Sequence, residues 1–445
     1  MSAIAVVGGG IAGLTIAHHL RAEHDVVLFE HEGTPGGKIR SRPIDGFLFE
    51  LGPSGFLSNA DELRDLVREV GLDDALIEAG PAAKNRFIYW NGRLHKLPSK
   101  PPEIFGMSLL SPRGKLRALG ELLVPRRAPG HGDGDESVYA FMERRFGREV
   151  AERIATPALL GISGGNAANT SLAAVFPRLP VMEREHGSVL RGMARGGRKP
   201  ARMCSFSGGG MQRLTDRLGE RLGNGLRLGT TVSRIERHGA RWRVVHDDGD
   251  HLADAVVVAT PADIAAELVA GFDSSLAAQL REISYAPMRA IGVAFRAEDV
   301  PVRLDGFGFL AARGSGVRIL GATYTSTIVP EQAPAGTAYL RIFMGGATDP
   351  EAGALAAERV RAIVLADVAT VLGITADPIA YHEVVWRQAI PQYTLRHRAT
   401  VTAIEEMSLA HAGFALAGNA YRGLGVGDTV RDARAVAARL HLVAV

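Results

Sequence analysis

A glycine-rich segment near the N-terminus constrains the fold of this chain most strongly. Residues 4–7 are an apolar run typical of a buried parallel strand, and residues 11–20 have the pattern of a helix. Between them, Gly8, Gly10 and Gly13 follow the spacing G-x-G-x-x-G. Glycines at these positions let backbone N–H groups approach a pyrophosphate at the helix N-terminus. The segment therefore predicts a Rossmann-type dinucleotide site.

The next strand supplies an acidic residue that such a site requires. Residues 26–30 form a second strand-like run that ends in Glu30, 17 positions after Gly13. A carboxylate there can accept hydrogen bonds from the adenosine ribose hydroxyls and would repel a 2′-phosphate. NADP is therefore disfavoured, whereas FAD and NAD both remain compatible with this segment.

Composition narrows the chemistry further. Hydrophobic residues make up 46% of the 445 residues, charged residues 22%, and there are 53 glycines, as in a soluble α/β enzyme of more than one domain. Cys204 is the only cysteine, which excludes an internal disulfide, a cysteine-ligated iron–sulfur cluster and a redox-active cysteine pair within one chain. Electron chemistry would need a bound organic cofactor.

Charge and hydropathy indicate where the protein acts. The net charge is +3 with the basic residues dispersed, so nucleic acid is not an expected partner. No apolar run is long enough to span a membrane, and the N-terminus lacks the features of a secretory signal. We expect a cytoplasmic protein whose membrane contact is at most peripheral. The basic stretch 191–202 either meets an anionic lipid surface or is a mobile solvated loop.

The pattern along the chain predicts an α/β fold with a discontinuous Rossmann-like domain. We assign residues 1–75, 206–275 and 386–445 to this domain, 76–97 and 276–385 to an α+β substrate domain, and 98–205 to a helical insertion that could associate with membranes. The same pattern predicts a helix over 63–78, a hairpin over 87–97, a strand pair over 226–245, strands at 255–260, 290–295 and 339–343, and a strand, glycine-rich turn and helix over 414–440.

Residues beyond Glu30 carry a family resemblance. Gly36, Gly37 and Lys38 are followed by Arg40–Arg42, Glu50, Gly52 and Pro53. This order resembles the flavin amine oxidase superfamily, in which a Gly-Gly-basic segment and a Gly-Pro turn lie beside the flavin. The resemblance implies FAD as cofactor, with contacts at Gly8, Gly9, Gly10, Ile11, Ala12, Gly13, Glu30, Gly37, Lys38, Gly52, Pro53, Ser54, Gly55, Val232, Trp386, Gly418, Gly425, Val426 and Gly427.

Within the superfamily the chain resembles the protoporphyrinogen oxidases. The similar segments are 136–176, 182–192, 386–397 (WRQAIPQYTLRH) and 418–429 (GNAYRGLGVGDT). The resemblance implies oxidation of protoporphyrinogen IX to protoporphyrin IX with dioxygen as acceptor, in porphyrin and haem biosynthesis. The sequence departs from the family pattern at Ser163, Asn166, Gly427 and Thr429, which leaves the substrate preference less secure than the fold.

The resemblance also implies a substrate site. Arg86 stands where some family members place an arginine that pairs with a propionate, and Leu310 and Tyr324 stand where apolar side chains enclose the macrocycle. Hydride loss from a carbon between pyrroles leaves a stabilised cation, so we nominate no catalytic acid or base, and the flavin carries the chemistry. His397 is interpreted as structural, and residues 131–136 (HGDGDE) as a loop and not a metal site.

Three alternative functions remain open at this stage. Coproporphyrinogen III oxidation uses the same flavin chemistry on a tetracarboxylate, and Arg86 mildly favours the dicarboxylate. Amine oxidation or carotenoid desaturation shares the fold, although no aromatic cage is identifiable. A non-catalytic tetrapyrrole carrier that keeps FAD is the third. A homodimer is a family expectation only.

Overall fold

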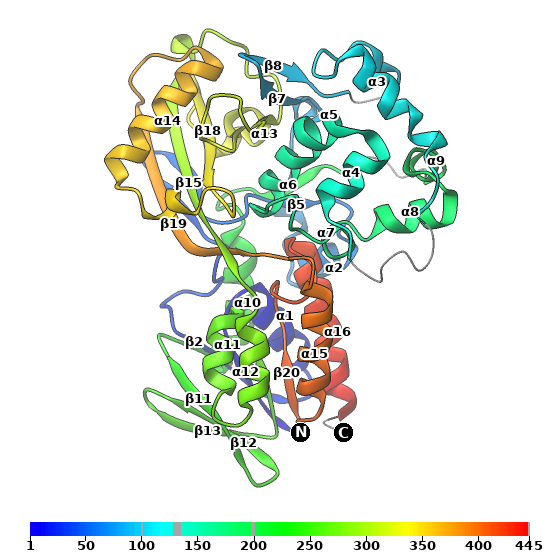
Figure 1. The fold of residues 1–445 in the computed structure, drawn as a ribbon. Helices are drawn as coiled ribbons and strands as arrows, with labels where there is room; N and C mark the ends of the chain where they lie inside the picture. Colours follow the sequence, from blue (N-terminus) through cyan, green and yellow to red (C-terminus); the bar gives the residue numbers. More distant parts are fainter. Residues whose placement is uncertain (99–100, 128–134, 197–200, 444–445) are drawn as a thin grey trace.

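The computed structural model describes residues 1–98, 101–127, 135–196 and 201–443, which form two lobes (Figure 1). The lower lobe holds both chain termini and is built around a parallel sheet. The upper lobe holds a large sheet, drawn mainly from yellow-green to orange with one hairpin in blue, and a group of helices, drawn cyan and green. This α/β architecture confirms the predicted fold class.

The sheet of the lower lobe has five parallel strands in the order β10-β2-β1-β14-β20. Their bounds are β1 Ala3–Val7, β2 Asp25–Glu30, β10 Leu226–Leu228, β14 Ala255–Val258 and β20 Phe414–Leu416. Because their carboxyl ends lie at one edge, the loops after β1, β2, β14 and β20 meet there. The cofactor loop predicted after β1 therefore lies at the edge that ligands use in such sheets.

Both faces of this sheet are covered, as its continuous apolar strands require. On β1, Ile4 and Val6 face one layer, while Ala5 and Val7 face the other. The first layer contains α1 Ile11–Leu20, α2 Asp61–Glu69, α10 Gln212–Leu222 and α16 Val426–Val443. The second contains α11 Ala262–Val269, α12 Ser274–Arg281 and α15 His397–Leu409, together with the small antiparallel sheet β11 Val232–His238, β12 Arg241–His246 and β13 Gly249–Ala253.

The upper lobe is organised by a seven-stranded sheet in the order β19-β15-β18-β17-β16-β7-β8. Its strands are β7 Arg86–Trp90, β8 Arg93–Lys96, β15 Tyr285–Arg296, β16 Gly308–Ala311, β17 Gly321–Tyr324, β18 Thr337–Gly345 and β19 Ala380–Pro391. α14 Ala357–Leu372 packs on one face through a large apolar cluster, and α13 Thr325–Ile328 follows β17 directly. β7 and β8 form the predicted hairpin, with Asn91 at φ 50° and Gly92 at φ 75° in its turn.

The described residues also form two smaller sheets. β3 Ser41–Ile44 pairs with β4 Phe47–Glu50, and β9 Met203–Phe206 lies between β5 Phe56–Leu57 and β6 Leu76–Glu78. The helical group contains α3 Pro112–Leu119, the 3₁₀ turn η4 Gly120–Leu123, α4 Val138–Phe146, α5 Arg148–Val150, a π-helical segment Ala151–Ala155, α6 Thr156–Ser163, α7 Leu172–Val175, α8 Arg178–His186 and α9 Val189–Arg195.

Three sequence expectations are wrong in part. The helix expected over 63–78 ends at Glu69, because Gly71 at φ 73° stops it and residues 76–78 pair as β6. The insertion over 98–205 is not purely helical, since β9 begins at Met203. The strand pair over 226–245 is divided: β10 joins the parallel sheet, and β11 and β12 belong to another sheet.

Candidate cofactor and substrate site

The loop after β1 has no room for side chains at its glycines. Gly8 has φ 108°, and a Cβ there would lie 2.8 Å from the carbonyl oxygen of Ala259. A Cβ on Gly13 would overlap the carbonyl oxygen of Gly8. The turn and the close helix–strand contact therefore depend on glycine at both positions.

The N-terminus of α1 presents groups that suit an anion. Gly10 is the N-cap, with extended backbone geometry and no side-chain hydrogen bond to the first turn. A Cβ on Gly10 would meet nothing within 4 Å, so open space lies against the loop. The N–H groups of a first turn and the helix dipole both attract a phosphate. The residues present thus fit the pyrophosphate of a dinucleotide.

Glu30 ends β2 beside this loop. Its carboxylate is buried and accepts hydrogen bonds from the Gly9 N–H at 2.6 Å and the Glu32 N–H at 2.9 Å. A carboxylate has about four acceptor positions, so it can still accept ribose hydroxyls. The Thr230 N–H donates to the Glu30 carbonyl at 2.9 Å, which places Val232 two residues beyond this contact. Predicted contacts from three separate segments therefore come together.

The Gly-Gly-basic segment packs directly on the first loop. The Gly36 N–H donates to the Gly9 carbonyl at 2.8 Å, and a Cβ on Gly37 would lie 3.2 Å from the Gly10 Cα. Lys38 turns toward β19, where its Nζ donates to the Ala389 carbonyl at 2.8 Å. Burial lowers the pKa of Lys38 to about 8. The segment thus links the predicted phosphate loop to the strand that leads into the upper lobe.

The Gly-Pro turn follows β4 and fits closely beneath this segment. A Cβ on Gly52 would overlap the carbonyl oxygen of Lys38, so only glycine is tolerated there. The Trp386 Nε1 donates to the Leu51 carbonyl at 2.7 Å, and the Arg341 guanidinium donates to the Gly52 carbonyl. Trp386, a predicted cofactor residue, therefore contacts the predicted flavin turn directly.

The last predicted cofactor segment follows β20. Gly418 has φ 124°, and a Cβ on it would meet nothing within 4 Å, so this strand end is also open. α16 begins at Val426, and a Cβ on Gly427 would lie 2.6 Å from the Ala60 Cβ. Gly427, a departure from the family pattern, is thus a packing position between α16 and the start of α2.

An apolar cluster lies next to the Trp386 end of this site. It consists of Leu160, Met288, Leu320 and Ala389, with Phe343, Trp386 and Ile390 packed against them. These residues come from α6 and from strands β15, β18 and β19 of the upper lobe, with Leu320 just before β17. The Gly164 carbonyl, at the end of α6, accepts a hydrogen bond from the Ala347 N–H at 2.7 Å. A buried apolar cluster therefore adjoins the turn at Gly52.

Comparisons with known proteins agree with this geometry. The model of the flavin-containing amine oxidoreductases matches residues 11–441. The chain belongs to this family. Protoporphyrinogen oxidase 1 of Arabidopsis thaliana is 30% identical over 465 residues, covering 96% of this chain and 86% of the relative. Coproporphyrinogen III oxidase of Bacillus subtilis is 27% identical, covering 97% and 96%. The crystal structure of a candidate protoporphyrinogen oxidase from Exiguobacterium has a TM-score of 0.87, 27% identity and 99% coverage of both chains.

Membership in the flavin-containing amine oxidoreductases makes the protein an oxidoreductase with FAD as its cofactor. The uncapped α1 N-terminus, the carboxylate of Glu30 and the glycines of the two loops are the groups that would hold it. The resemblance read from the sequence is thereby confirmed, whereas the individual contacts stay predictions.

The structure places the three predicted substrate residues in different surroundings. Arg86 begins β7 and is exposed, with its guanidinium 5.3 Å from the Phe307 ring centre. Leu310, on β16, fills the space beside Gly161 of α6. Tyr324 is 2% exposed and packs in the core beneath α14, so the structure gives it a packing role. Its contact with substrate stays a prediction.

Two further residues singled out in the sequence, His397 and Cys204, are buried and have packing roles. His397 stacks on Tyr393 with ring centres 3.8 Å apart, its Nε2 is 3.1 Å from the Tyr421 carbonyl oxygen, and burial lowers its pKa to about 4. Cys204 is buried, and burial raises its pKa to about 11, so its thiol is inert at neutral pH. Residues 131–134 of the HGDGDE segment, and residues 197–200 of the basic stretch, lie outside the described residues.

The departures from the family pattern make local contacts. Ser163 Oγ donates to the Leu159 carbonyl at 3.0 Å, Asn166 Oδ1 accepts from the Ala168 N–H at 3.1 Å, and Thr429 Oγ1 donates to the Gly425 carbonyl at 3.0 Å. Sequence reasoning missed two residues at the Gly-Pro turn, Arg341 and Gln332. The signal for Arg341 was a charged residue within an otherwise apolar strand.

Proposed function

We propose that this enzyme oxidises protoporphyrinogen IX to protoporphyrin IX, with dioxygen as the electron acceptor. The observation that carries the proposal is the apolar cluster around Met288 and Trp386, which adjoins the predicted flavin turn at Gly52. A porphyrinogen is a large apolar macrocycle and requires such a surface beside the oxidant. The near-full-length similarity to a plant protoporphyrinogen oxidase supports the same substrate class.

The chain's own residues bind and orient, and the cofactor supplies the redox chemistry. FAD, when bound, accepts hydride. Glycines at positions 8, 13 and 52 bring backbone groups close to where it would lie, and the buried apolar cluster would keep water from the neighbouring substrate region. A meso carbon between electron-rich pyrroles needs no strong base, so no side chain is assigned proton abstraction.

We propose that Arg86 pairs with a substrate propionate. Its guanidinium is exposed, unlike the paired arginines buried in the upper lobe, and a planar guanidinium suits a carboxylate. The alternative substrate is coproporphyrinogen III, and the Bacillus subtilis relative, which matches over 96% of its length, favours it. The two substrates differ in the number of carboxylates. Further basic side chains around the substrate site, besides Arg86, would favour the tetracarboxylate.

Substrate choice is tested with both porphyrinogens under anaerobic conditions. We expect protoporphyrinogen IX to bleach the flavin band faster than coproporphyrinogen III, with porphyrin fluorescence after oxygen is readmitted. The reverse order would assign the coproporphyrinogen branch, and reduction by neither would refute both. A primary amine serves as the control for amine oxidation, and we expect it to leave the flavin oxidised.

We further propose a cytoplasmic protein that meets an anionic membrane surface through its helical group. No helix in the described part of the chain is both long and apolar enough to cross a bilayer. Exposed apolar residues instead gather on α3, η4 and α9, at the outer side of the upper lobe (Figure 1). Leu123 is 85% exposed and Met193 62%. Arg113, Lys115 and Arg191 lie on the same elements, as expected for lipid headgroup contact.

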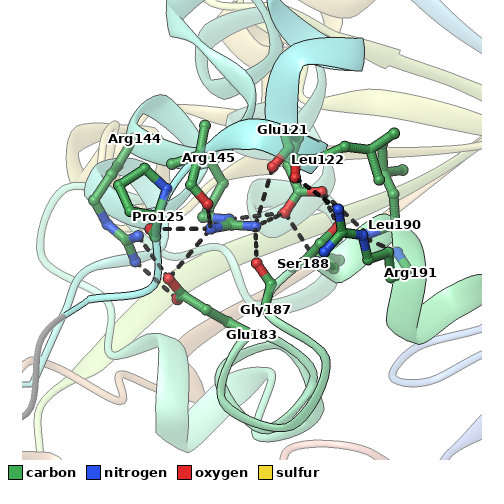
Figure 2. Close-up of polar contacts among 12 residues, drawn as sticks. Glu121, Leu122, Pro125, Arg144, Arg145, Glu183, Gly187, Ser188, Leu190 and Arg191 are labelled. Atoms are coloured by element: carbon green, nitrogen blue, oxygen red, sulfur yellow. Dashed lines mark hydrogen bonds and ion pairs between the residues drawn. The ribbon is translucent and has the colours of Figure 1, made fainter.

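A buried ion-pair network holds this apolar surface in place (Figure 2). Glu121, in η4, accepts hydrogen bonds from Arg145 Nε at 2.8 Å and from the Val189 N–H at 2.9 Å. Ser188 also donates to Glu121, which therefore binds the N-terminus of α9. Because η4 and α9 are joined at this carboxylate, Leu123 and Met193 are presented from one rigid unit.

Vesicle flotation tests the membrane proposal. We expect the holoenzyme to float with vesicles of anionic lipid and Leu123→Asp to float less, with Leu409→Asp, an exposed leucine at the end of α15 in the lower lobe, as the matched control. Equal flotation of the two variants would refute the assigned surface.

The predicted domain boundaries and a homodimer also stay proposals. The homodimer can be tested by light scattering.

A further inference from the structure

Three side chains of the upper lobe donate hydrogen bonds to residues 50–52, which lead into the Gly-Pro turn. Gln332 Nε2 donates to Glu50 Oε1 at 3.3 Å, Trp386 Nε1 donates to the Leu51 carbonyl at 2.7 Å, and Arg341 donates to the Gly52 carbonyl. The three side chains come from the turn Pro330–Gln332 (η8), from β18 and from β19. Three consecutive residues at the end of β4 are therefore held by side chains of the upper lobe.

Burying the charged side chain of Arg341 costs free energy that an apolar residue in the same strand would not cost. Its side chain is 3% exposed, its Nε has no hydrogen-bond partner, and the neighbouring Tyr339 hydroxyl has none either. Its guanidinium carbon lies 4.6 Å from the Phe343 ring centre, within an apolar environment. Burial lowers the pKa of Arg341 to about 10, so it remains charged at neutral pH. An apolar residue at this strand position would avoid these unpaired groups.

Glu50 supplies the opposing charge, without a direct ion pair to Arg341 at 4.0 Å or less among the described contacts. It is buried and accepts hydrogen bonds from Ser41 Oγ at 2.6 Å and from the Met211 N–H at 3.0 Å, besides Gln332. Burial raises the pKa of Glu50, while its three hydrogen bonds and the charge of Arg341 favour the ionised carboxylate. A buried cation and a buried carboxyl group therefore both adjoin the residues that precede Pro53.

We propose that Arg341 is a positioning residue that holds the Gly52–Pro53 turn against the flavin, and that its charge raises the flavin reduction potential while Glu50 lowers it. The inference rests on the proposed cofactor site. A reduced flavin carries more negative charge than an oxidised one, so a nearby buried cation stabilises it and a buried anion destabilises it. The carbonyl of Gly52, polarised by the guanidinium, is the link between the charge and the turn.

The experiment measures the flavin midpoint potential of the holoenzyme by dye equilibration, without porphyrinogen. We expect Arg341→Leu to lower the potential, Glu50→Gln to raise it, and the double variant to return toward the wild-type value. Arg341→Lys keeps the charge and should shift the potential less than Arg341→Leu. The loss of a charged hydrogen bond to the turn should also weaken FAD retention by about tenfold in Arg341→Leu.

The matched control is Arg289→Leu, which removes another buried arginine from the same sheet. Arg289 donates to Glu383 at 2.9 Å and to the Ala352 carbonyl at 2.7 Å, within the upper lobe, so its loss should leave the potential unchanged. Equal shifts in Arg289→Leu and Arg341→Leu, or a Glu50→Gln potential at or below the wild-type value, would overturn the inference. If Arg341→Leu does not fold, the Glu50→Gln and Arg341→Lys measurements decide. Wild-type flavin reduction by porphyrinogen tests the proposed function separately.

Discussion

Replacing Glu121 by glutamine should loosen the helical group while leaving the parallel sheet intact. Glu121 and Arg145 are both fully buried, and the carboxylate accepts from Arg145, Ser188 and the Val189 N–H (Figure 2). Burial opposes ionisation of Glu121, but these hydrogen bonds outweigh it and lower the pKa. Glutamine keeps the shape, removes the charge, and turns an amide donor toward other donors.

The size of the effect follows from what remains around Arg145. Its Nη1 keeps the Val124 carbonyl at 3.0 Å and Glu183 Oε1 at 3.4 Å, and its Nη2 keeps the Gly187 carbonyl at 3.0 Å. Glu183 is already engaged by Arg144 at 2.8 Å, so it compensates only in part. Breaking one side of a buried pair costs about 3 to 5 kcal/mol, and we expect about 3 kcal/mol, or roughly 150-fold in the local opening equilibrium.

Hydrogen exchange measured by mass spectrometry reports local opening, which is needed because a chain of two lobes need not unfold in one step. Peptides covering residues 178–195 should exchange much faster in Glu121→Gln, and those covering β1 should not. The control is Glu152→Gln, which removes an exposed pair with Arg148 at 2.7 Å and should leave the exchange of these peptides unchanged. Equal exchange in both variants, or acceleration across the whole chain, would show that the network does not act as described.

Three other changes have outcomes set by the structure. Gly52→Ala would push a methyl group into the Lys38 carbonyl, so we expect purified protein with little flavin absorbance but normal secondary structure by circular dichroism. Arg86→Ala should raise KM for the porphyrinogen about tenfold with little change in kcat, whereas an unchanged KM would argue against propionate pairing. His397 has a folded pKa of about 4 against 6.5 unfolded, so the unfolded state binds more protons between these values and stability is lost as pH falls from 6.5 to 4. His397→Gln should remove up to about 3 kcal/mol of that loss, seen as a flatter dependence of the unfolding midpoint on pH.

The elements with strong local signals could be predicted from the sequence. The run over residues 4–7, the helix over 11–20 and the acidic end at Glu30 each combine a periodicity with a glycine or an acid at a fixed spacing, and the structure has all three. The hairpin over 87–97 was set by Asn91 and Gly92, whose positive φ values the turn requires. These features depend on neighbours in sequence, so no knowledge of distant contacts was needed.

Elements defined by distant partners could not be predicted. β6 and β9 are three and four residues long and exist because they pair with each other across more than a hundred residues. Likewise β10 joins β2 of the parallel sheet, whereas β11, which follows shortly after Gly229, belongs to another sheet. Pairing over such distances leaves little pattern in so few residues.

The candidate site divides in the same way. Glycines at positions 8, 13 and 52 were predictable because they belong to recognisable motifs. In the structure, backbone atoms leave no room for a side chain at each of them. Arg341 was not, because one charged residue in an apolar strand does not show which carbonyl it will reach. Tyr324 is buried, as the alternating apolar pattern of its strand predicts, whereas a resemblance to a position in a family does not give the direction of a side chain.

Anaerobic reduction of the bound flavin by protoporphyrinogen IX tests the central claim most directly. We expect rapid bleaching of the flavin band on mixing, and recovery of the band with porphyrin fluorescence once oxygen is admitted. A flavin that binds normally but stays oxidised with both protoporphyrinogen IX and coproporphyrinogen III would contradict the assignment of this enzyme to porphyrinogen oxidation.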